Sequence, residues 1–403
     1  MALSPWLFAH VKHDAPYAWF RRYHGLFSSQ LTPQHIDEYE HKLAEYLQLV
    51  RLDTEGEVDY LSAMGPDTWG AVFILTVVAI EQHNTERFTV ILDDIAERDT
   101  QYDELVSALT WLPIGRSVKA IKQTLKHASA KVRACGIEAL SILKQPPDEQ
   151  SLLHWLTAGS DEERVAALQL IGDLKATTPA IAQQLGQLLN IEKANSTEVF
   201  YAIRAALLLG NKDFVRRLKP YLEKPNEHFN EAVMAAFSVL SKADIEQQLD
   251  QWFHTGLPLE LRLFALMVAG LPHRMTEVLD AINDPAYNQQ AGMVFSVITG
   301  MHLDDASLSL DVASDFEPQA ANSDYADLPM PDPILAPNWW RQHEQAFDPN
   351  NRYLGGQTHS PEGFIDLHQS ARQYTRYLAG QFAAYQQPNF VADNLRARRI
   401  RVC

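Results

Sequence analysis

The chain has 403 residues, of which 46% are hydrophobic and 10% are aromatic, a composition that excludes a wholly disordered protein. Its formal net charge of −17 at pH 7 argues against a protein that holds nucleic acid or anionic lipid, because both ligands require a basic surface. We therefore expect neither nucleic acid nor a membrane as partner. The length predicts one to three domains with a large core, and the acidity favours a basic protein partner.

The N-terminal residues lack the features of a secretion signal. They have no basic start, no long apolar core and no small-residue cleavage site. The most apolar run, Trp69–Ile80, is shorter than the roughly 20 residues that cross a bilayer, so it predicts a buried helix. The two cysteines, Cys135 and Cys403, are too few for a zinc cluster or a disulfide framework. These features predict a cytoplasmic protein.

Residues 1–65 are expected to form an N-terminal helical cap. Thr32 and Pro33 are typical of a helix start, with Thr32 as the N-cap and Pro33 at the first helical position. The amphipathic segment that follows would cover the first of the helical repeats described next, since the end of a stack otherwise exposes its core.

Residues 66–302 contain a helical run that recurs and ends each time in a small residue. The spacings between these residues are 31, 38, 31, 29 and 30. Between the runs lie second amphipathic segments, and two helices per repeat predict an all-α fold, an α-solenoid of HEAT-like repeats with almost no sheet. Glycine at the end of a run also favours a left-handed helix stop. The small residues are Ser141, Gly172, Gly210, Ser241, Gly270 and Gly300.

Residues 303–338 break the repeat and are rich in Asp, Ser, Ala and Pro, which predicts an extended acidic linker. The stretch Met275–Trp340 contains 11 acidic residues and no Lys or Arg. One interpretation is an acidic strip that binds a basic partner, and the other is a linker kept in solution by its charge. The partner-binding hypothesis concerns Asp304, Asp305, Asp311 and Asp315.

Residues 339–403 are expected to form a helical C-terminal tail. One helix is predicted at its start and one long helix over 361–386, where Ser360 is a suitable N-cap and Pro361 occupies the first helical position.

Two further features of the tail have competing interpretations. The pair Trp339 and Trp340 either anchors the linker to the repeats or forms a hot spot for a partner. The basic run 396–401 could touch nucleic acid, but on an acidic protein we expect it to pair with acidic surface.

No pattern in the chain is typical of a catalytic, metal or cofactor site. There is no GxSxG, no phosphate-binding loop and no dinucleotide-binding GxGxxG. The N-terminal histidines lack the spacing of a zinc helix, since His35 and His41 are six residues apart. Paired carboxylates such as Asp93 and Asp94 are expected to stabilise helix starts. The sequence therefore predicts no enzyme, no cofactor and no metal.

The tail carries a motif formed by Leu328, Pro329, Pro331, Asp332, Pro333, Trp339, Trp340, Phe347, Pro349, Arg352, Tyr353, Leu354 and Gly356. The motif resembles the signature tail of a bacterial family of HEAT-like-repeat proteins encoded near type VI secretion genes. Trp19 with Arg21 and Arg22, and the later pair Arg372 and Gln373, are also similar to that family. The resemblance implies a role near contact-dependent toxin delivery, although the family has no firmly established activity.

These observations favour a non-catalytic solenoid that binds a protein. The leading hypothesis is a cytoplasmic immunity protein that binds and neutralises a type VI toxin effector. The first alternative is an adaptor or chaperone that loads an effector onto the secretion machine. A further alternative is an enzyme, because HEAT-like repeats also occur in bilin lyases and in DNA glycosylases. A glycosylase would need a basic groove for DNA, which the charge balance argues against.

Overall fold

The structure is a computed structural model that describes residues 5–52, 69–98, 101–190, 196–310 and 328–398. It is all-helical, with 20 α-helices and 71% of residues helical in the described part of the chain, which confirms the all-α part of the predicted fold class. The named strands of the described part are β1 (Tyr353–Leu354) and β2 (Gln357–Thr358), which form one antiparallel hairpin. The prediction of almost no sheet is therefore also confirmed for these residues.

The chain divides into two compact units. The first unit comprises Met1–Phe27, Pro33–Leu209 and Val391–Cys403. The second unit comprises Ser28–Thr32 and Gly210–Phe390. The four segments expected from the sequence stay a prediction.

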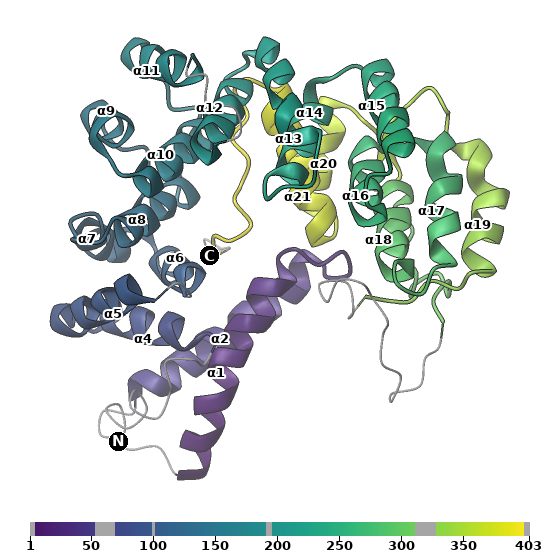
Figure 1. The fold of residues 1–403 in the computed structure, drawn as a ribbon. Helices are drawn as coiled ribbons and strands as arrows, with labels where there is room; N and C mark the ends of the chain where they lie inside the picture. Colours follow the sequence, from purple (N-terminus) through teal and green to yellow (C-terminus); the bar gives the residue numbers. More distant parts are fainter. Residues whose placement is uncertain (1–4, 53–68, 99–100, 191–195, 311–327, 399–403) are drawn as a thin grey trace. The chain divides into compact units, whose positions relative to one another are not determined.

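The first unit contains a row of helices in which α4 packs on α6, α6 on α8, α8 on α10 and α10 on α12 (Figure 1). Helices α5, α7, α9 and α11 alternate with them along the chain and pack against the row. This alternation is consistent with a helical repeat fold. The helices are α4 (Ala71–Glu81), α5 (Thr85–Glu97), α6 (Tyr102–Trp111), α7 (Ile114–Thr124), α8 (Ala130–Ile142), α9 (Glu149–Ala158), α10 (Asp161–Leu174), α11 (Pro179–Leu189) and α12 (Thr197–Leu208).

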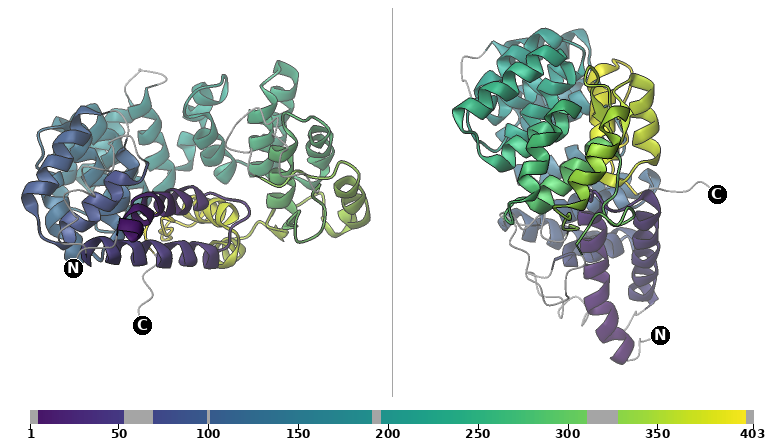
Figure 2. Two further views of the ribbon diagram at one scale, coloured as in Figure 1. Left: turned by 90° about the horizontal axis from the view of Figure 1, so that it is seen from below. Right: turned by 90° about the vertical axis from the view of Figure 1, so that its right-hand side faces the viewer.

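Two longer helices, α1 (Pro5–Gly25) and α2 (Pro33–Leu52), pack against each other and against α4 (Figure 2). The predicted helix start at Pro33 is confirmed. Trp19 of α1 is fully buried, and its ring centroid lies 6.0 Å from that of Phe73 in α4. Helix α4 is buried along nearly its whole length, as its apolar sequence predicts. The N-terminal helices therefore cover the apolar end of the row.

The second unit contains a shorter row in which α14 packs on α16 and α16 on α18 (Figure 1). The intervening elements pack against this row, and α21 packs on both α14 and α20. The elements are η1 (Lys212–Leu218), α13 (Lys219–Leu222), α14 (Phe229–Val239), α15 (Lys242–Thr255), α16 (Leu259–Ala269), η2 (Pro272–Arg274), α17 (Met275–Ile282), α18 (Asn288–Thr299), α19 (Leu335–His343), η4 (Glu344–Ala346), α20 (Pro361–Ser370) and α21 (Gln373–Gln386).

The glycines that end the sequence runs have two different roles. Gly270 and Gly300 follow α16 and α18 with φ of 62° and 73°, so the predicted left-handed helix stops are confirmed there. The predicted stop at Gly172 is wrong, because α10 continues past it and Lys175 takes the left-handed conformation. A Cβ at Gly172 would lie 3.1 Å from the Cα of Ala205 in α12, so this glycine permits close packing of two helices.

The described ends of the segment expected to be an extended linker are paired with each other. Ser309 and Pro331 form an isolated antiparallel bridge, and the N–H of Asp332 donates to the carbonyl oxygen of Leu308 at 2.7 Å. The Asp332 carboxylate also accepts from the N–H of Leu335 at 2.9 Å, where α19 begins. Helix α19 therefore starts inside the segment expected to be a linker, because Asp332 satisfies N–H groups of its first turn.

Candidate partner-binding surface

The tail residue Arg352 caps two helices of the second unit. Its Nε and Nη2 donate to the carbonyl oxygens of Ala269 at 2.8 Å and Val268 at 3.0 Å, at the end of α16. Its Nη1 donates to the carbonyl oxygen of Phe237 at 2.8 Å, near the end of α14. The last carbonyls of a helix have no partner within it and carry partial negative charge, which suits a guanidinium. Burial lowers the pKa of Arg352 to about 9, so it remains charged at neutral pH.

The backbone of the hairpin extends this capping to α18. The N–H of Tyr353 donates to the carbonyl oxygen of Gly270 at 2.7 Å. The N–H groups of the two glycines after Leu354 donate to the carbonyl oxygens of Val297 at 2.6 Å and Ile298 at 3.0 Å. Residues 352–356, at the centre of the tail motif, thus cap α14, α16 and α18. This part of the motif has a structural role. The two glycines are Gly355 and Gly356, with φ of 58° and 76°.

The two tail tryptophans contact neighbours within the second unit. Trp340 is buried, and its ring centroid lies 5.2 Å from that of Phe347. Trp339 lies edge-on to Phe295 of α18, with centroids 5.5 Å apart, and stacks on His343 at 4.2 Å. The contact between Trp339 and Phe295 joins α19 to α18, as expected of an anchor. A partner hot spot at this pair stays a prediction.

The acidic residues singled out in the sequence fall into two groups. Asp305 pairs with Arg372 at 2.5 Å, and Asp304 accepts from the hydroxyl of Ser309 at 2.6 Å. Both carboxylates thus already have hydrogen-bonding partners inside the second unit. A basic partner protein would have to compete with Arg372 and Ser309 for them. The other two, Asp311 and Asp315, lie outside the described residues.

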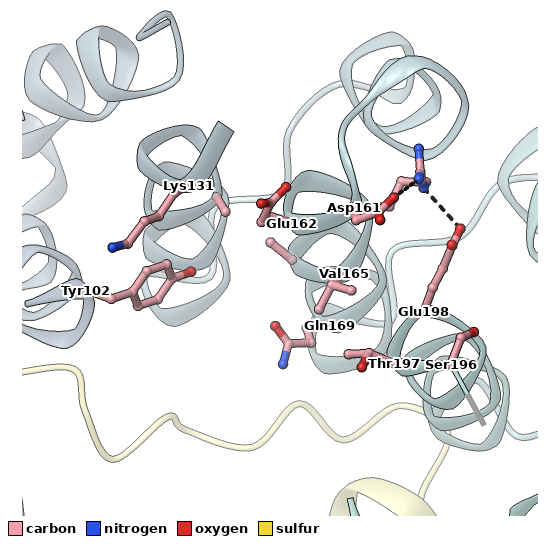
Figure 3. Close-up of a pocket in the computed structure, with 12 residues that line it drawn as sticks. Tyr102, Lys131, Asp161, Glu162, Val165, Gln169, Ser196, Thr197 and Glu198 are labelled. Carbon is pink, nitrogen blue, oxygen red and sulfur yellow. Dashed lines mark hydrogen bonds and ion pairs between the residues drawn. The ribbon is translucent and has the colours of Figure 1, made fainter. Parts of the chain in front are cut away.

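A groove in the first unit is the strongest candidate for a binding surface. It has a volume of about 690 Å³ and runs over α8, α10 and α12, with Tyr102 of α6 at one end. Figure 3 shows Tyr102 and Lys131 on one side, Glu198 on the other, and residues of α10 between them. Val165 and Ala166 of α10 contribute apolar surface to the lining. Side chains from successive helices of one row therefore share a single open space.

The groove has a mixed but net acidic lining. Arg164 lies between Asp161 and Glu198 and forms ion pairs with both; its Nε is 3.1 Å from a Glu198 oxygen (Figure 3). Glu162 is exposed at the start of α10, and Lys131 donates to the backbone carbonyl of Arg98. Three carboxylates and two cations line the space, so the local charge is −1.

The start of α10 beside the groove is rigidly held. Ser160 and Glu163 form a capping box, and the Glu163 carboxylate also accepts two hydrogen bonds from Arg133 of α8, at 2.7 and 2.8 Å. These hydrogen bonds from Arg133 lower the pKa of Glu163 to about 2, against the opposing effect of burial. A capping box and a fork-like ion pair fix the backbone that carries Asp161 and Glu162.

A smaller polar pocket of about 70 Å³ adjoins the groove, because Ala166 and Gln169 line both spaces. Its lining includes Glu138 and Asp173 from the helix row and Asn394 from the C-terminal segment. The groove therefore continues toward the point where the end of the chain contacts the row.

The described part of the basic run 396–401 confirms one expectation and contacts residues that the sequence did not single out; residues 399–401 lie outside the described part. Arg396 forms ion pairs with Asp103 of α6 and Glu138 of α8, as expected of the basic run against acidic surface. Neither acid belongs to a recognisable motif. They lie 293 and 258 residues from Arg396 in the sequence, so only the tertiary fold brings them together.

Within the described ranges, no three His, Cys, Asp or Glu side chains converge as metal ligands would. None of the helices described is both long enough and apolar enough to cross a membrane.

Comparison with known proteins identifies no relative. No protein-family model matches the chain, and neither a curated protein nor a solved structure is detectably similar to it. Function must therefore be inferred from the geometry described above.

Proposed function

We propose that the protein is a non-catalytic binding protein, a HEAT-like α-solenoid whose groove over α8, α10 and α12 holds a segment of a partner protein. The observation that carries this proposal is the shared space of about 690 Å³ lined by successive helices of one row. Stacked helical repeats offer extended surfaces of this kind, and each repeat adds contacts without needing a reactive group.

The charge of the groove favours a partner with a basic segment. Asp161, Glu162 and Glu198 outnumber the two cations of the lining, and the whole chain carries a net charge of −17. Complementary charge accelerates association and excludes acidic competitors. The apolar lining of Val165 and Ala166 would contribute the buried contact that charge alone does not supply.

The tail motif supports a narrower proposal, a link to type VI secretion. In this setting the protein is a cytoplasmic immunity protein that binds and neutralises a toxin effector. The alternative is an adaptor or chaperone that loads the effector onto the secretion machine. Rescue of toxin-poisoned cells would support the first role, and loss of secretion on deletion without rescue would support the second.

The test is a titration of the full-length chain with toxin domains encoded beside its gene. We compare wild type with Glu162→Lys in the groove and with Glu97→Lys, a matched charge reversal at an exposed residue at the end of α5, outside the groove. Glu162→Lys should weaken binding at least about tenfold, because it places a cation against a basic segment. Glu97→Lys should change affinity less than about twofold. Equal affinities for all three forms would contradict the proposal.

A further inference from the structure

The C-terminal segment of the first unit, Val391–Arg398, lies on the helix row in the manner of a bound peptide. It forms neither helix nor strand, and Figure 1 shows it in yellow beside the row. Lys144, just after α8, donates to the carbonyl oxygen of Val391 at 3.3 Å and pairs with Asp393 at 2.6 Å. The start of the segment is thus held through both its backbone and a side chain.

The central contact of the segment is an arginine in an acidic socket. The Arg396 guanidinium reaches Asp103 of α6 at 2.7 Å and also pairs with Glu138 of α8. It lies over the ring of Tyr23 in α1, 5.8 Å from the centroid. The Arg396 side chain is only 14% exposed, although it belongs to a segment without regular structure. Three helices therefore contribute to one arginine-binding socket.

The helices also clamp the backbone and a second arginine. Nη2 of Arg22 donates to the carbonyl oxygens of Arg396 at 3.0 Å and Ala397 at 3.3 Å. Arg398 stacks over the ring of Trp111, 4.3 Å from the centroid. Side chains in sockets combined with hydrogen bonds to the main chain are the means by which domains recognise extended peptides.

We propose that this socket, formed by Tyr23, Asp103 and Glu138, recognises an arginine of an extended peptide from the partner, and that the chain's own segment occupies it until the partner displaces it. This inference rests on the proposed binding function and names the chemistry of the partner's segment. The C-terminal segment is then a competitor built into the chain, with arginines at alternate positions.

The groove and the small polar pocket next to the socket are also consistent with a bound peptide. Asn394 lines the small polar pocket that shares Ala166 and Gln169 with the groove. A peptide in the groove could therefore continue into the socket without crossing another helix row. Its arginine would replace Arg396 between two carboxylates, so that neither acid is left unpaired.

The experiment measures binding of a synthetic peptide with the sequence of residues 391–398 to the full-length chain. In the Arg396→Ala chain the internal competitor loses its socket contact, so this form should bind the peptide at least about tenfold more tightly than wild type. Binding should weaken with added salt. A control peptide with alanine in place of the socket arginine should not bind, and Asp103→Asn with Glu138→Gln in the Arg396→Ala chain should abolish binding.

An Arg396→Ala chain that melts like wild type but binds no peptide would overturn the proposal. If that variant does not fold, amide hydrogen exchange of the wild-type chain replaces it. Residues 391–398 should exchange faster than α8, since a displaceable segment opens locally. If residues 391–398 and α8 exchange at the same rate, the segment does not open separately from the helices. This result would refute the inference.

The inference and the proposed function can fail separately. Peptide binding in the socket, combined with a toxin affinity that Glu162→Lys leaves unchanged, would reject only the proposed role of the groove. A toxin affinity that depends on Glu162, combined with no peptide binding, would reject only the socket.

Discussion

Arg22 and Glu40 form a buried ion pair that joins α1 to α2, with side chains only 2% and 6% exposed. Nη2 and Nε of Arg22 lie 2.8 and 3.0 Å from the same carboxylate oxygen. A buried charge that loses its partner keeps its desolvation cost, so Arg22→Ala should lower the free energy of unfolding by about 3–5 kcal/mol. Denaturant unfolding followed by tryptophan fluorescence measures this loss.

The matched control is the adjacent Arg21, which is exposed and donates to the hydroxyl of Tyr39 at 3.0 Å. Arg21→Ala should cost at most about 1 kcal/mol, as for other exposed contacts. Similar losses for the two variants would show that the buried pair does not join the helices as described.

Arg352 should be important for the stability of the second unit. Arg352→Ala removes three charge-assisted hydrogen bonds to carbonyl groups, so we expect a loss of about 3 kcal/mol. Arg352→Lys should recover only part of this, because an ammonium cannot reproduce the fork of donors. Thermal unfolding followed by circular dichroism gives the values. Arg341→Ala, an exposed arginine on α19, should stay within about 0.5 kcal/mol of wild type, and an equal loss there would contradict the capping role.

Gly270, which follows α16, can be used to test how closely the hairpin residue Tyr353 approaches the end of this helix. A Cβ at Gly270 would collide with the carbonyl oxygen of Tyr353, in addition to the strain of its positive φ. Gly256, after α15, has a similar φ of 72° but open space around it. Gly256→Ala should therefore cost about 1–2 kcal/mol of unfolding free energy, and Gly270→Ala clearly more. Equal costs in thermal unfolding would mean that the hairpin does not contact α16 as described.

Protonation of Glu104 should make the free energy of unfolding depend on pH. Its carboxylate accepts from the N–H groups of Val72 and Phe73 at the start of α4, yet burial raises its pKa to about 7, from 4.5. Between these pH values the folded chain binds more protons than the unfolded chain, so raising the pH lowers the free energy of unfolding. The loss should reach about 3 kcal/mol by pH 8.

The control for this effect is Glu104→Gln, which keeps an acceptor oxygen but does not titrate. Denaturant unfolding at several pH values should show a smaller decline between pH 4.5 and 7 for the variant than for wild type. Parallel profiles for the two proteins would contradict the raised pKa of Glu104.

Local features of the sequence predict much of the helical structure. The N-cap role of Ser360 is confirmed, since its hydroxyl accepts from the N–H of Gly363 at 3.0 Å. The buried helix predicted over Trp69–Ile80 is confirmed from Ala71 onward, whereas Trp69 lies before the helix and is 64% exposed. The left-handed stop at Gly300 is also confirmed. These features depend on residues within a few positions of one another, so a pattern along the chain is sufficient to reveal them.

Features that depend on residues far apart in the sequence cannot be predicted from local sequence patterns. The segment after Ser360 reads as one helix, but the chain breaks at Ala371 and Arg372 into α20 and α21. The first N–H groups of α21 donate to the carbonyl oxygens of Leu31 at 2.8 Å and Ser28 at 3.1 Å. These partners lie more than 300 residues away, and nothing near the break in the sequence indicates them.

The candidate partner-binding surface was also predictable only in part from the sequence. An acidic partner for Arg396 was expected from its charge, but Asp103 and Glu138 could not be chosen from among the 51 acidic residues. The groove on α10 was not predicted at all, because it requires the stacking of three helices. The tail motif was found in the sequence, but its capping role depends on carbonyl groups of other helices.

The proposed function requires that a protein partner binds in the groove over α8, α10 and α12. Amide hydrogen exchange of the full-length chain, with and without its bound toxin domain, tests this most directly. Binding should slow exchange at residues 161–169 and 196–198, the two ranges that contain the lining residues from α10 and the start of α12. Protection confined to the second unit, with unchanged exchange in α8, α10 and α12, would contradict it.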